Sequence, residues 1–378
     1  MNKKRQSTQS DIPIDTILEV AKKLIKIPSV SGDIEKSVEV LKFTETQLTG
    51  INFRPFASES IPSLLYSNRD KSTNRFKIIL NAHLDVVPGA SEQFEPYIKD
   101  TKLYGRGAYD MKAASAAKII LFKELIHKVC YPLALQLTTD EETGGINGTA
   151  YQIQQGIRGD FVITAECGSN FRIVHEAKGM LHLKLIAKGK VSHSAYPWNG
   201  ENAILKIYEA LDAIYKAYPL PKAEAYKTTI NVTHIQTTNS SKHTITPDNC
   251  EVLLDVRYIP QEKKVIIQNI QKLLPEGITT EVVFHTMPHE TNSNNEYIRS
   301  LQRIGQSILH RDLELRKQHA TSDARYYSNV NNDGVEFGPI GENQHHNEEW
   351  VDIKSLGDYY QILKKFLLEI DAKETMIK

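Results

Sequence analysis

The sequence predicts an α/β fold with a mostly parallel sheet, into which a smaller α+β domain is inserted. In the first part of the chain, short apolar runs alternate with segments of helical periodicity, the pattern of strands joined by crossover helices. Between residues 177 and 289 the order becomes strand, helix, strand, strand, helix, strand, as in a ferredoxin-like βαββαβ unit. We therefore expect one domain from residues 1–176 and 290–378 and an inserted domain from residues 177–289.

The first helix is expected over residues 13–26, because apolar residues recur there at helical spacing. Pro28 ends it, and a second helix is predicted over residues 33–48. Short apolar runs bounded by turn residues indicate buried strands, and longer periodic segments indicate helices. On these criteria the rest of this part contains strands at 77–82, 133–139 and 161–165 and helices at 113–127 and 150–155.

The inserted domain repeats the same kinds of pattern at a different spacing. Its predicted strands lie at 180–187, 228–237, 250–257 and 278–285, and its predicted helices at 202–217 and 262–274. Helix, strand and helix signals then resume from about residue 295 to residue 371. This last segment is expected to return to the first domain.

Composition excludes several classes of protein. The 46 lysines and arginines balance the 46 aspartates and glutamates, which argues against non-specific nucleic-acid binding. No apolar run approaches the roughly 18 residues of a membrane span, and Met1–Asp11 has no apolar core of a secretory signal. The three cysteines lack CxxC spacing, which excludes a cysteine zinc site and fits a cytoplasmic protein.

Acidic residues and histidines follow the three predicted strands of the first domain. They are His83 and Asp85 after the first, Asp140, Glu141 and Glu142 after the second, and Glu166 after the third. Ligands of open α/β sheets bind at the carboxyl ends of the strands, so these side chains should share one edge. Asp110, at the start of a predicted helix, and His345, in a polar loop, are further candidates.

The spacing within these groups suggests their chemistry. His83 and Asp85 point the same way along an extended segment, so Asp85 can orient the ring while its other nitrogen binds a metal. Glu141 and Glu142 are adjacent, which favours one metal ligand and one free base. The alternatives are a capping aspartate beside an exposed histidine and a solvated acidic turn.

These residues belong to a set of ordered motifs. The motifs are HLD at 83–85, GRGAYDMK at 105–112, DEETGG at 140–145, AE at 165–166, GP at 338–339 and HHNEE at 345–349. In this order they resemble the M20 metallopeptidase family, di-zinc hydrolases that include succinyl-diaminopimelate desuccinylases, acetylornithine deacetylases, aminoacylases and glutamate carboxypeptidases. The resemblance implies a zinc-peptidase-type catalytic domain, and the insertion lies where the family carries its lid and dimerisation domain.

The resemblance also implies the role of each site residue. One metal ion would be held by His83 and Glu166, a second by Glu142 and His345, with Asp110 bridging the two, Asp85 orienting His83 and Glu141 acting as general base. His345 is preferred to His346 because the family's histidine precedes a glutamate by four, here Glu349. Such ligands suit Zn²⁺ but also Co²⁺ or Mn²⁺, and the ions would favour formation of a bridging hydroxide from water.

The inserted domain resembles the family's lid at residues 189–195, which contain His193. The family's histidine reaches an active site across a homodimer and stabilises the oxyanion, whereas the alternative is a loop histidine near the 202–217 helix. Arg257, and Arg325 in the segment Thr321–Arg325, match positions that bind the substrate carboxylate. An isolated arginine would otherwise be expected in a surface salt bridge.

Two positions depart from the pattern of desuccinylases. Thr244, three residues before Pro247, and Gly341, three residues after Gly338, each replace an asparagine. Both departures count against a specific assignment as a succinyl-diaminopimelate desuccinylase and do not involve the metal-ligand candidates. Cys167, beside Glu166, is expected to be a small buried residue and no nucleophile, since a neighbouring carboxylate raises the pKa of a thiol.

The expected function is hydrolysis of the amide bond of an N-acyl amino acid. Glu166 supports it, because aminopeptidases and dipeptidases of the family usually carry aspartate there. The alternatives are a carboxypeptidase or dipeptidase that acts on short peptides, and an inactive ligand-binding homologue. Neither nucleic acid nor a membrane is expected as a partner.

Overall fold

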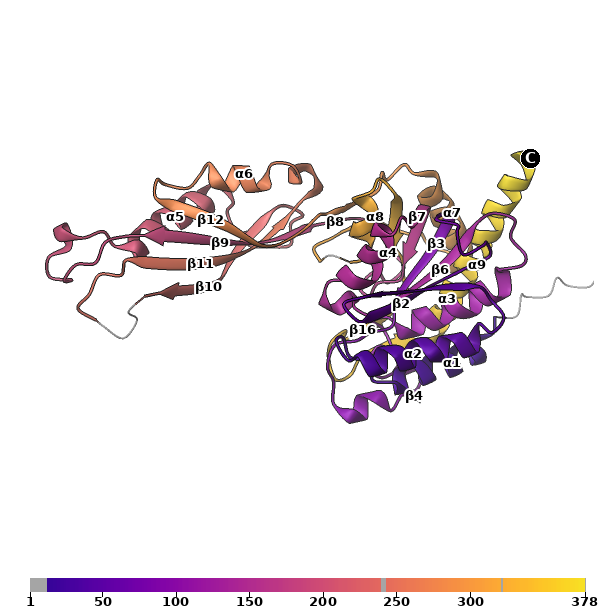
Figure 1. Ribbon diagram of the computed structural model, residues 1–378. Helices are drawn as coiled ribbons and strands as arrows, with labels where there is room; N and C mark the ends of the chain where they lie inside the picture. Colours follow the sequence, from indigo (N-terminus) through magenta and orange to yellow (C-terminus); the bar gives the residue numbers. More distant parts are fainter. Residues whose placement is uncertain (1–11, 239–242, 321, 378) are drawn as a thin grey trace, which may run out of the picture. The chain divides into compact units, whose positions relative to one another are not determined.

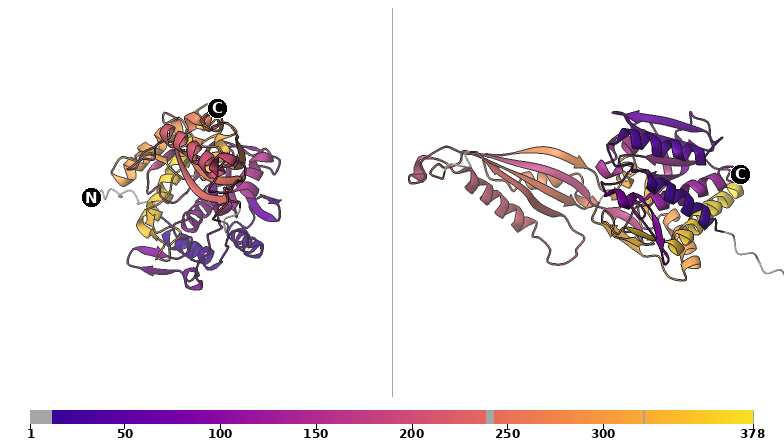
Figure 2. Two further views of the ribbon diagram at one scale, coloured as in Figure 1. Left: turned by 90° about the vertical axis from the view of Figure 1, so that its left-hand side faces the viewer. Right: turned by 90° about the horizontal axis from the view of Figure 1, so that it is seen from below.

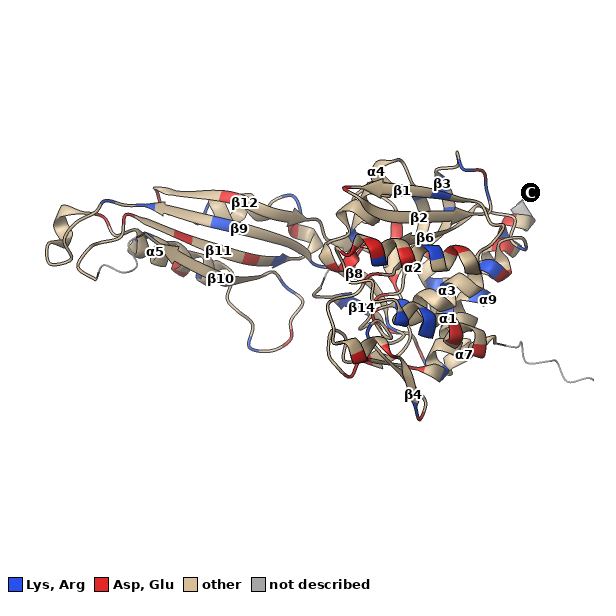
Figure 3. Cartoon of the chain, turned by 60° about the horizontal axis from the view of Figure 1, so that its bottom comes forward, with Lys and Arg blue, Asp and Glu red and all other residues tan. Residues whose placement is uncertain are grey.

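The computed structural model describes residues 12–238, 243–320 and 322–377 (Figure 1). The segment Met1–Asp11, for which the sequence indicates no secretory signal, lies outside the described residues. The chain divides into two compact units, Met1–His175 with Thr291–Arg316 and Ser322–Lys378, and Glu176–Glu290 with Lys317–Thr321. Acidic and basic residues are spread over both units (Figure 3).

The first unit is built on a mixed sheet. Its strands follow the order β1 (Phe53–Ser58), β2 (Ile61–Ser67), β6 (Leu133–Thr138), β3 (Arg75–His83), β7 (Arg158–Thr164), β15 (Asp333–Glu336), β8 (Ile173–Ala177) and β13 (His289–Glu290), with β14 (Leu315–Gln318) paired to β8. The central strands β6, β3, β7 and β15 are parallel, and the outer pairs are antiparallel. This arrangement confirms the predicted α/β class.

Helices cover both faces of this sheet (Figures 1 and 2). On one face a large apolar cluster contains Ile78 and Leu80 of β3 together with residues of α1 (Ile14–Lys26), α2 (Ile34–Gln47), α3 (Lys112–Leu125), α7 (Glu296–Leu309) and α9 (Ile353–Ile377). Phe76 and Ile79 of the same strand belong to a second cluster with α4 (Tyr151–Gln154) and α8 (Ala324–Ser328). Both faces of the strands are buried, which is why they read as continuous apolar runs.

Two lysines of α3 are fully buried beneath the sheet edge. The Lys118 ammonium donates to the carbonyls of Asn81 in β3 (2.5 Å) and Ile163 in β7 (2.7 Å). Lys112 donates to the carbonyls of Leu24 and Ile27 just beyond α1. Burial lowers the pKa of both amines, that of Lys112 to about 7. Lys118 therefore links β3, which ends at His83, to β7, which ends two residues before Glu166.

A small antiparallel sheet completes the first unit. Its order is β16 (Gly341–Glu342), β17 (Trp350–Asp352), β5 (Lys102–Tyr104) and β4 (Tyr97–Lys99). The sheet brings the segment before Asp110 beside the segment that follows His345. Gly341 needs to be glycine here, because a Cβ would lie 2.3 Å from the Tyr109 ring and 2.5 Å from the Trp350 carbonyl oxygen. Packing against Tyr109 and Trp350 therefore accounts for glycine at this position, where desuccinylases carry asparagine.

The second unit is an antiparallel sheet with two helices. Its elements are β9 (Gly179–Lys188), α5 (Ala203–Ala217), β10 (Thr229–Thr237), β11 (Asn249–Tyr258), α6 (Ile266–Gln271) and β12 (Ile278–Thr286), and the sheet order is β10-β11-β9-β12. Leucines of β9 alternate inward and pack with Ile207 and Ile214 of α5. The element order is that of a βαββαβ unit.

Several details differ from the sequence prediction. The helix expected over 262–274 is shorter, because Pro260–Glu262 forms a 3-10 turn and the α-helix begins only at Ile266. Residues 317–320 lie with the second unit, where the backbone of Gln318 accepts from Lys178 and Lys317 pairs with Glu176. Strands β1, β2 and β8 were not predicted. No helix among the described residues is long and apolar enough to span a bilayer.

Candidate metal centre and active site

The three neighbouring strands β6, β3 and β7 end at one edge of the sheet and supply most of the candidate residues. His83 is the last residue of β3, Asp140 and the turn Glu141–Thr143 follow β6, and Glu166 follows β7 by two residues. Because these strands are parallel neighbours, their carboxyl ends meet. The loops before α3 and after β16 add Asp110 and His345.

Asp110 lies between two imidazole rings. Its Oδ1 is 3.2 Å from Nε2 of His83, and its Oδ2 is 3.3 Å from Nε2 of His345. The same nitrogen of His345 is 3.1 Å from Oε2 of Glu142. Burial alone would raise the pKa of Asp110, but hydrogen bonds from His345 and His83 hold it well below its usual range. The two oxygens of Asp110 thus face two separate groups of donors.

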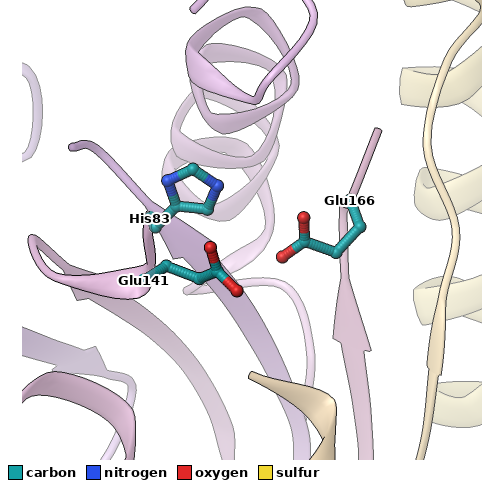
Figure 4. Close-up of side chains that lie close together, drawn as sticks. All are labelled: His83, Glu141 and Glu166. Carbon is teal, nitrogen blue, oxygen red and sulfur yellow. The ribbon is translucent and has the colours of Figure 1, made fainter. Parts of the chain in front are cut away.

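Three groups of potential metal ligands result, one of which contains Asp110, Glu166 and Cys167. One ligand atom from each of Asp110, Glu142 and His345 lies within 4.8 Å of the others, and the same holds for His83, Glu141 and Glu166. Figure 4 shows the side chains of His83, Glu141 and Glu166 pointing toward one another. His345, which is 46% exposed, thus lies in one group with Asp110 and Glu142.

The electrostatics of this edge favour a cation. Burial raises the pKa of Glu141, Glu142 and Glu166, and carboxylates nearby raise each of them further. Oε1 of Glu166 is buried and has no hydrogen-bond partner among the described residues. Hydrogen bonds to Asp110 and Glu142 raise the pKa of His345 to about 10. An excess of buried carboxylates beside two imidazoles is the donor set of a divalent metal ion, so the residues fit such a group.

Asp85 organises the centre from behind. Its fully buried carboxylate accepts from the backbone N–H of Glu141 (3.2 Å), the backbone N–H of Glu142 (3.1 Å) and the Ser31 hydroxyl (2.6 Å). Nδ1 of His83 lies 3.0 Å from the Asp85 carbonyl oxygen and 3.4 Å from its Oδ1. Asp85 therefore contacts the ring of His83 and also holds the turn that carries both glutamates.

A buried ion pair that sequence reasoning did not assign positions Asp110. Oε1 of Glu349 accepts from the backbone N–H groups of Tyr109 (2.9 Å) and Asp110 (3.0 Å), and its Oε2 is 2.8 Å from the Arg106 guanidinium. Arg106 also donates to the carbonyls of His345 and His346. The pair thus ties the Asp110 segment to the His345 loop. In the sequence, only the spacing of Glu349 from His345 indicated that Glu349 belongs to the site.

Arg325 supports the turn next to the two glutamates. Its guanidinium is buried (2% exposed), donates to the Gly144 carbonyl (2.6 Å) and stacks on the Tyr326 ring. Its Nε has no hydrogen-bond partner among the described residues. Thr321, the first residue of the matched segment, lies outside the described residues. Arg325 therefore combines a structural contact with a donor that is still unused.

His193 and Arg257 lie in the second unit. His193 is in an exposed loop, where its Nδ1 accepts from the backbone N–H of Ala195 (3.1 Å). The carbonyl of Thr244 accepts from the backbone of Ser194, so Thr244 helps to hold this loop. Arg257 in β11 forms a two-pronged ion pair with Asp255 at 2.8 and 3.1 Å. Each of these residues is described within its own unit.

Cys167 is buried directly beside Asp110. Its Sγ donates to Oδ2 of Asp110 at 3.2 Å. Burial and the charges of Asp110 and Glu166 raise the pKa of the thiol well above its usual value. The shift agrees with the expectation that Cys167 is no nucleophile.

Comparisons with known proteins show which family this chain matches. Residues 79–369 match the profile of peptidase family M20/M25/M40. A succinyl-diaminopimelate desuccinylase of Marinobacter nauticus is 26% identical over 94% of this chain and 98% of its own length. The enzyme of that name from Xylella fastidiosa strain 9a5c is 30% identical over 77% of this chain and 83% of its own length.

Solved structures share the fold. An aminopeptidase from Bacillus cereus matches with a TM-score of 0.78 at 17% identity, over 95% of this chain and 99% of its own. A tripeptidase from Staphylococcus aureus matches with a TM-score of 0.77 at 20% identity, over 96% and 99% of the two chains. These likenesses extend over nearly the whole chain.

The role of Asp85 can be tested by Asp85→Asn. The substitution replaces a carboxylate that accepts two backbone N–H groups by an amide. His83 and the turn of Glu141 and Glu142 should then be held less firmly, so the affinity for a divalent ion should fall by about 10–100-fold. Titration of the metal-depleted protein with Zn²⁺ or Co²⁺ measures this affinity. Asp160→Asn, which removes a carboxylate near the opposite end of β7, is the matched control and should bind metal normally. Equal affinities for the Asp85 variant and the wild type would contradict this role.

Proposed function

The chain belongs to peptidase family M20/M25/M40, and on that premise we propose that it is a metal-dependent amidohydrolase that cleaves an N-acyl amino acid. The observation that carries the proposal is the position of Asp110, whose two oxygens face the imidazoles of His83 and His345. A carboxylate shared between two sets of ligands is the arrangement expected for a pair of divalent ions.

The proposed ligands are divided between two ions. His83 and Glu166 would hold the first, Glu142 and His345 the second, and Asp110 would contact both. Zn²⁺ is the proposed metal, and Co²⁺ or Mn²⁺ would suit the same oxygen and nitrogen donors. When bound, such ions act as Lewis acids that polarise the scissile carbonyl and lower the pKa of water.

Glu141 is proposed as the general base. Asp85 holds its backbone N–H, and its carboxylate lies beside His83 and Glu166. Burial raises its pKa, which favours the uptake of a proton from the attacking water. In the proposed reaction, Glu141 accepts a proton from the attacking water and then delivers it to the amide nitrogen as the amine leaves.

Substitution of the two adjacent glutamates separates their roles. Glu141→Gln should keep the metal but lose about 10²–10⁴-fold in turnover, because a positioned base contributes about that much. Glu142→Gln should instead lower the metal content, because it removes a ligand. Metal per chain is measured by elemental analysis and turnover with an N-acyl amino acid. The same loss of metal in both variants would contradict the assignment, as would full activity of the metal-depleted wild type.

We propose that His193 acts in the active site of a partner subunit. Its motif matches the family's lid, and the second unit exposes apolar side chains suited to a homodimer, including Trp198 (76% exposed), Leu205 (59%) and Tyr208 (68%). An imidazole donor directed at the developing oxyanion supports amide hydrolysis. We therefore propose a homodimer in which each active site receives His193 from the other chain.

Complementation tests this sharing. Co-expressed His193→Ala and Glu141→Gln chains should regain part of the activity that each lacks alone, because one site of the heterodimer has both groups intact. Sedimentation velocity measures the oligomeric state of the same sample. If His193 served the site of its own chain, both sites of the heterodimer would be damaged and no activity would return. A fully active monomer would also contradict the proposal.

The substrate is proposed to carry a free α-carboxylate, bound by Arg325 and Arg257. A guanidinium can hold both oxygens of a carboxylate, which an ammonium cannot reproduce. Support comes from the unused Nε of Arg325 and from the Arg257 side chain, which is 32% exposed. The name of the curated relatives makes an N-succinyl amino acid the first candidate, followed by N-acetyl amino acids. A carboxypeptidase or dipeptidase acting on short peptides is the alternative.

Arg325→Lys tests the carboxylate contact. For the free acid, kcat/KM should fall by about 10–100-fold, the loss expected for a charged hydrogen bond. For the matching amide, whose carboxylate is capped, the wild type should be slow and the variant unchanged. If Arg325 only supports the Gly144 turn, kcat/KM will fall equally for both substrates. Arg158→Lys is the matched control, because Arg158 also binds backbone carbonyls but lies at the opposite end of β7.

A panel of N-succinyl, N-acetyl and dipeptide substrates, assayed with the metal-loaded wild type, distinguishes the deacylase from the peptidase. Binding of these compounds without turnover would instead favour a ligand-binding homologue. We also propose a cytoplasmic location, which the three free cysteines support. Cell fractionation tests it.

A further inference from the structure

Two arginines of the first unit converge on the loop that follows Glu166. Nη2 of Arg172 and Nη1 of Arg316 both donate to the carbonyl oxygen of Gly168, at 3.2 and 3.4 Å. Nε of Arg172 also donates to the carbonyl oxygen of Ser169 (3.1 Å). Two positive charges therefore lie side by side, just beyond a proposed metal ligand.

Neither of these charges is paired with a carboxylate among the described residues. All the hydrogen bonds that those residues accept from the two guanidinium groups end on backbone carbonyl oxygens. By contrast, Arg106 and Arg257 each hold a carboxylate at 2.8 Å. Both side chains of the pair are only partly buried, so their remaining N–H groups can reach a ligand. Like charges repel one another, and an anion bound between them removes the repulsion.

We propose that Arg172 and Arg316 bind a second carboxylate of the substrate, in addition to its α-carboxylate. The inference rests on the proposed function and names a class of substrate, N-acyl amino acids with a further negative charge on the acyl group or on the side chain. A guanidinium binds a carboxylate through charge-assisted hydrogen bonds of fixed direction, so two of them select strongly for a charged group.

The pair lies at the same sheet edge as the metal centre. Arg172 directly precedes β8, which is antiparallel to β15 with Val174 opposite Glu336, the last residue of β15. Because β15 is parallel to β7, the start of β8 lies at the carboxyl end of β7, where Glu166 follows. The Cα atoms of Glu166 and Gly168 are two residues apart and thus within about 7 Å of each other. A short acyl chain or amino-acid side chain spans a distance of this order.

Contacts with two other segments fix the loop that carries the pair. The Tyr109 hydroxyl accepts from the backbone N–H of Gly168 and donates to Oδ1 of Asn170 (2.7 Å). The same oxygen of Asn170 accepts from the backbone N–H of Gly341 (3.1 Å). Binding groups that are already held in place lose little freedom when a ligand binds. The pair therefore lies on an ordered loop beside Gly341, where desuccinylases carry asparagine.

The competing explanation is that both arginines only hold the Gly168 carbonyl and so stabilise the loop. In that case their removal would affect charged and neutral substrates alike. If they bind a carboxylate, the effect depends on the charge of the substrate. The two explanations thus differ in a ratio of rates, which a general loss of stability does not change.

Matched pairs of substrates measure this ratio. One pair is an N-succinyl amino acid and its N-succinamoyl analogue, whose distal carboxylate is replaced by an amide, and the other is N-acetylglutamate and N-acetylglutamine. We expect the metal-loaded wild type to prefer the charged member of one pair, through a lower KM. Arg172→Gln and Arg316→Gln should each reduce that preference by about 10–100-fold, the loss expected for hydrogen bonds to a charged group. The pair that shows the preference tells whether the second carboxylate lies on the acyl group or on the side chain.

Arg69→Gln is the matched control. Arg69 also donates to backbone carbonyls, those of Asn68 and Cys130, and the backbone of Asn68 pairs with Leu133 at the start of β6, the opposite edge of the sheet. This variant should keep the preference of the wild type. Equal falls for charged and neutral members in the Arg172 and Arg316 variants would overturn the inference, as would equal rates for both members of both pairs in the wild type.

Equilibrium binding separates this inference from the proposed reaction. The same four compounds are titrated calorimetrically into metal-loaded Glu141→Gln protein, which should not cleave them. Tighter binding of a charged member, lost on addition of Arg172→Gln, supports the second-carboxylate site even if the wild type hydrolyses no N-acyl amino acid, a result that refutes the amidohydrolase proposal alone. Hydrolysis with no preference for charge in binding or turnover refutes the arginine site alone. Absence of both binding and turnover refutes both.

Discussion

The buried carboxylate of Asp85 is the contact on which the arrangement of the candidate centre depends. It receives hydrogen bonds from the Ser31 hydroxyl and from the backbone of Glu141 and Glu142, and it lies against the ring of His83. Because a buried charge is stable only with such partners, the carboxylate and its donors hold one another in place. One side chain thereby sets the relative positions of a metal-ligand candidate and both adjacent glutamates.

The Arg106–Glu349 pair plays the matching part for the other ligands. It is buried and joins residues 243 positions apart, and Glu349 also receives the backbone N–H of Asp110. Buried ion pairs contribute little net stability but strongly disfavour arrangements that separate their members. Asp85 and Glu349 therefore position opposite sides of the same group of side chains, one through β3 and β6 and the other through the loops around Asp110 and His345.

Local patterns predicted the elements that carry the centre, because β3, β6 and β7 are apolar runs whose polar followers meet at one edge. Strands β1 and β2 escaped prediction because Pro55 and Pro62 interrupt their patterns, and proline is tolerated only at strand edges, starts and bulges. The roles of Arg106, Glu349 and Lys118 arise from contacts between distant segments. No spacing along the chain reveals such contacts, whereas the ordered motifs did reveal the ligand candidates.

The order of the segments has a consequence for biosynthesis. His345 and Glu349 come from the end of the chain, after the whole of the second unit, whereas their partners Asp110 and Arg106 come from its first third. A ribosome therefore releases the strands β9–β12 of the second unit before His345, the last of the proposed ligands. Until then the acidic residues that follow β3, β6 and β7 lack both His345 and the contact of Glu349 with the backbone of Asp110. Any function that needs both Asp110 and His345 can therefore begin only after the second unit has been synthesised.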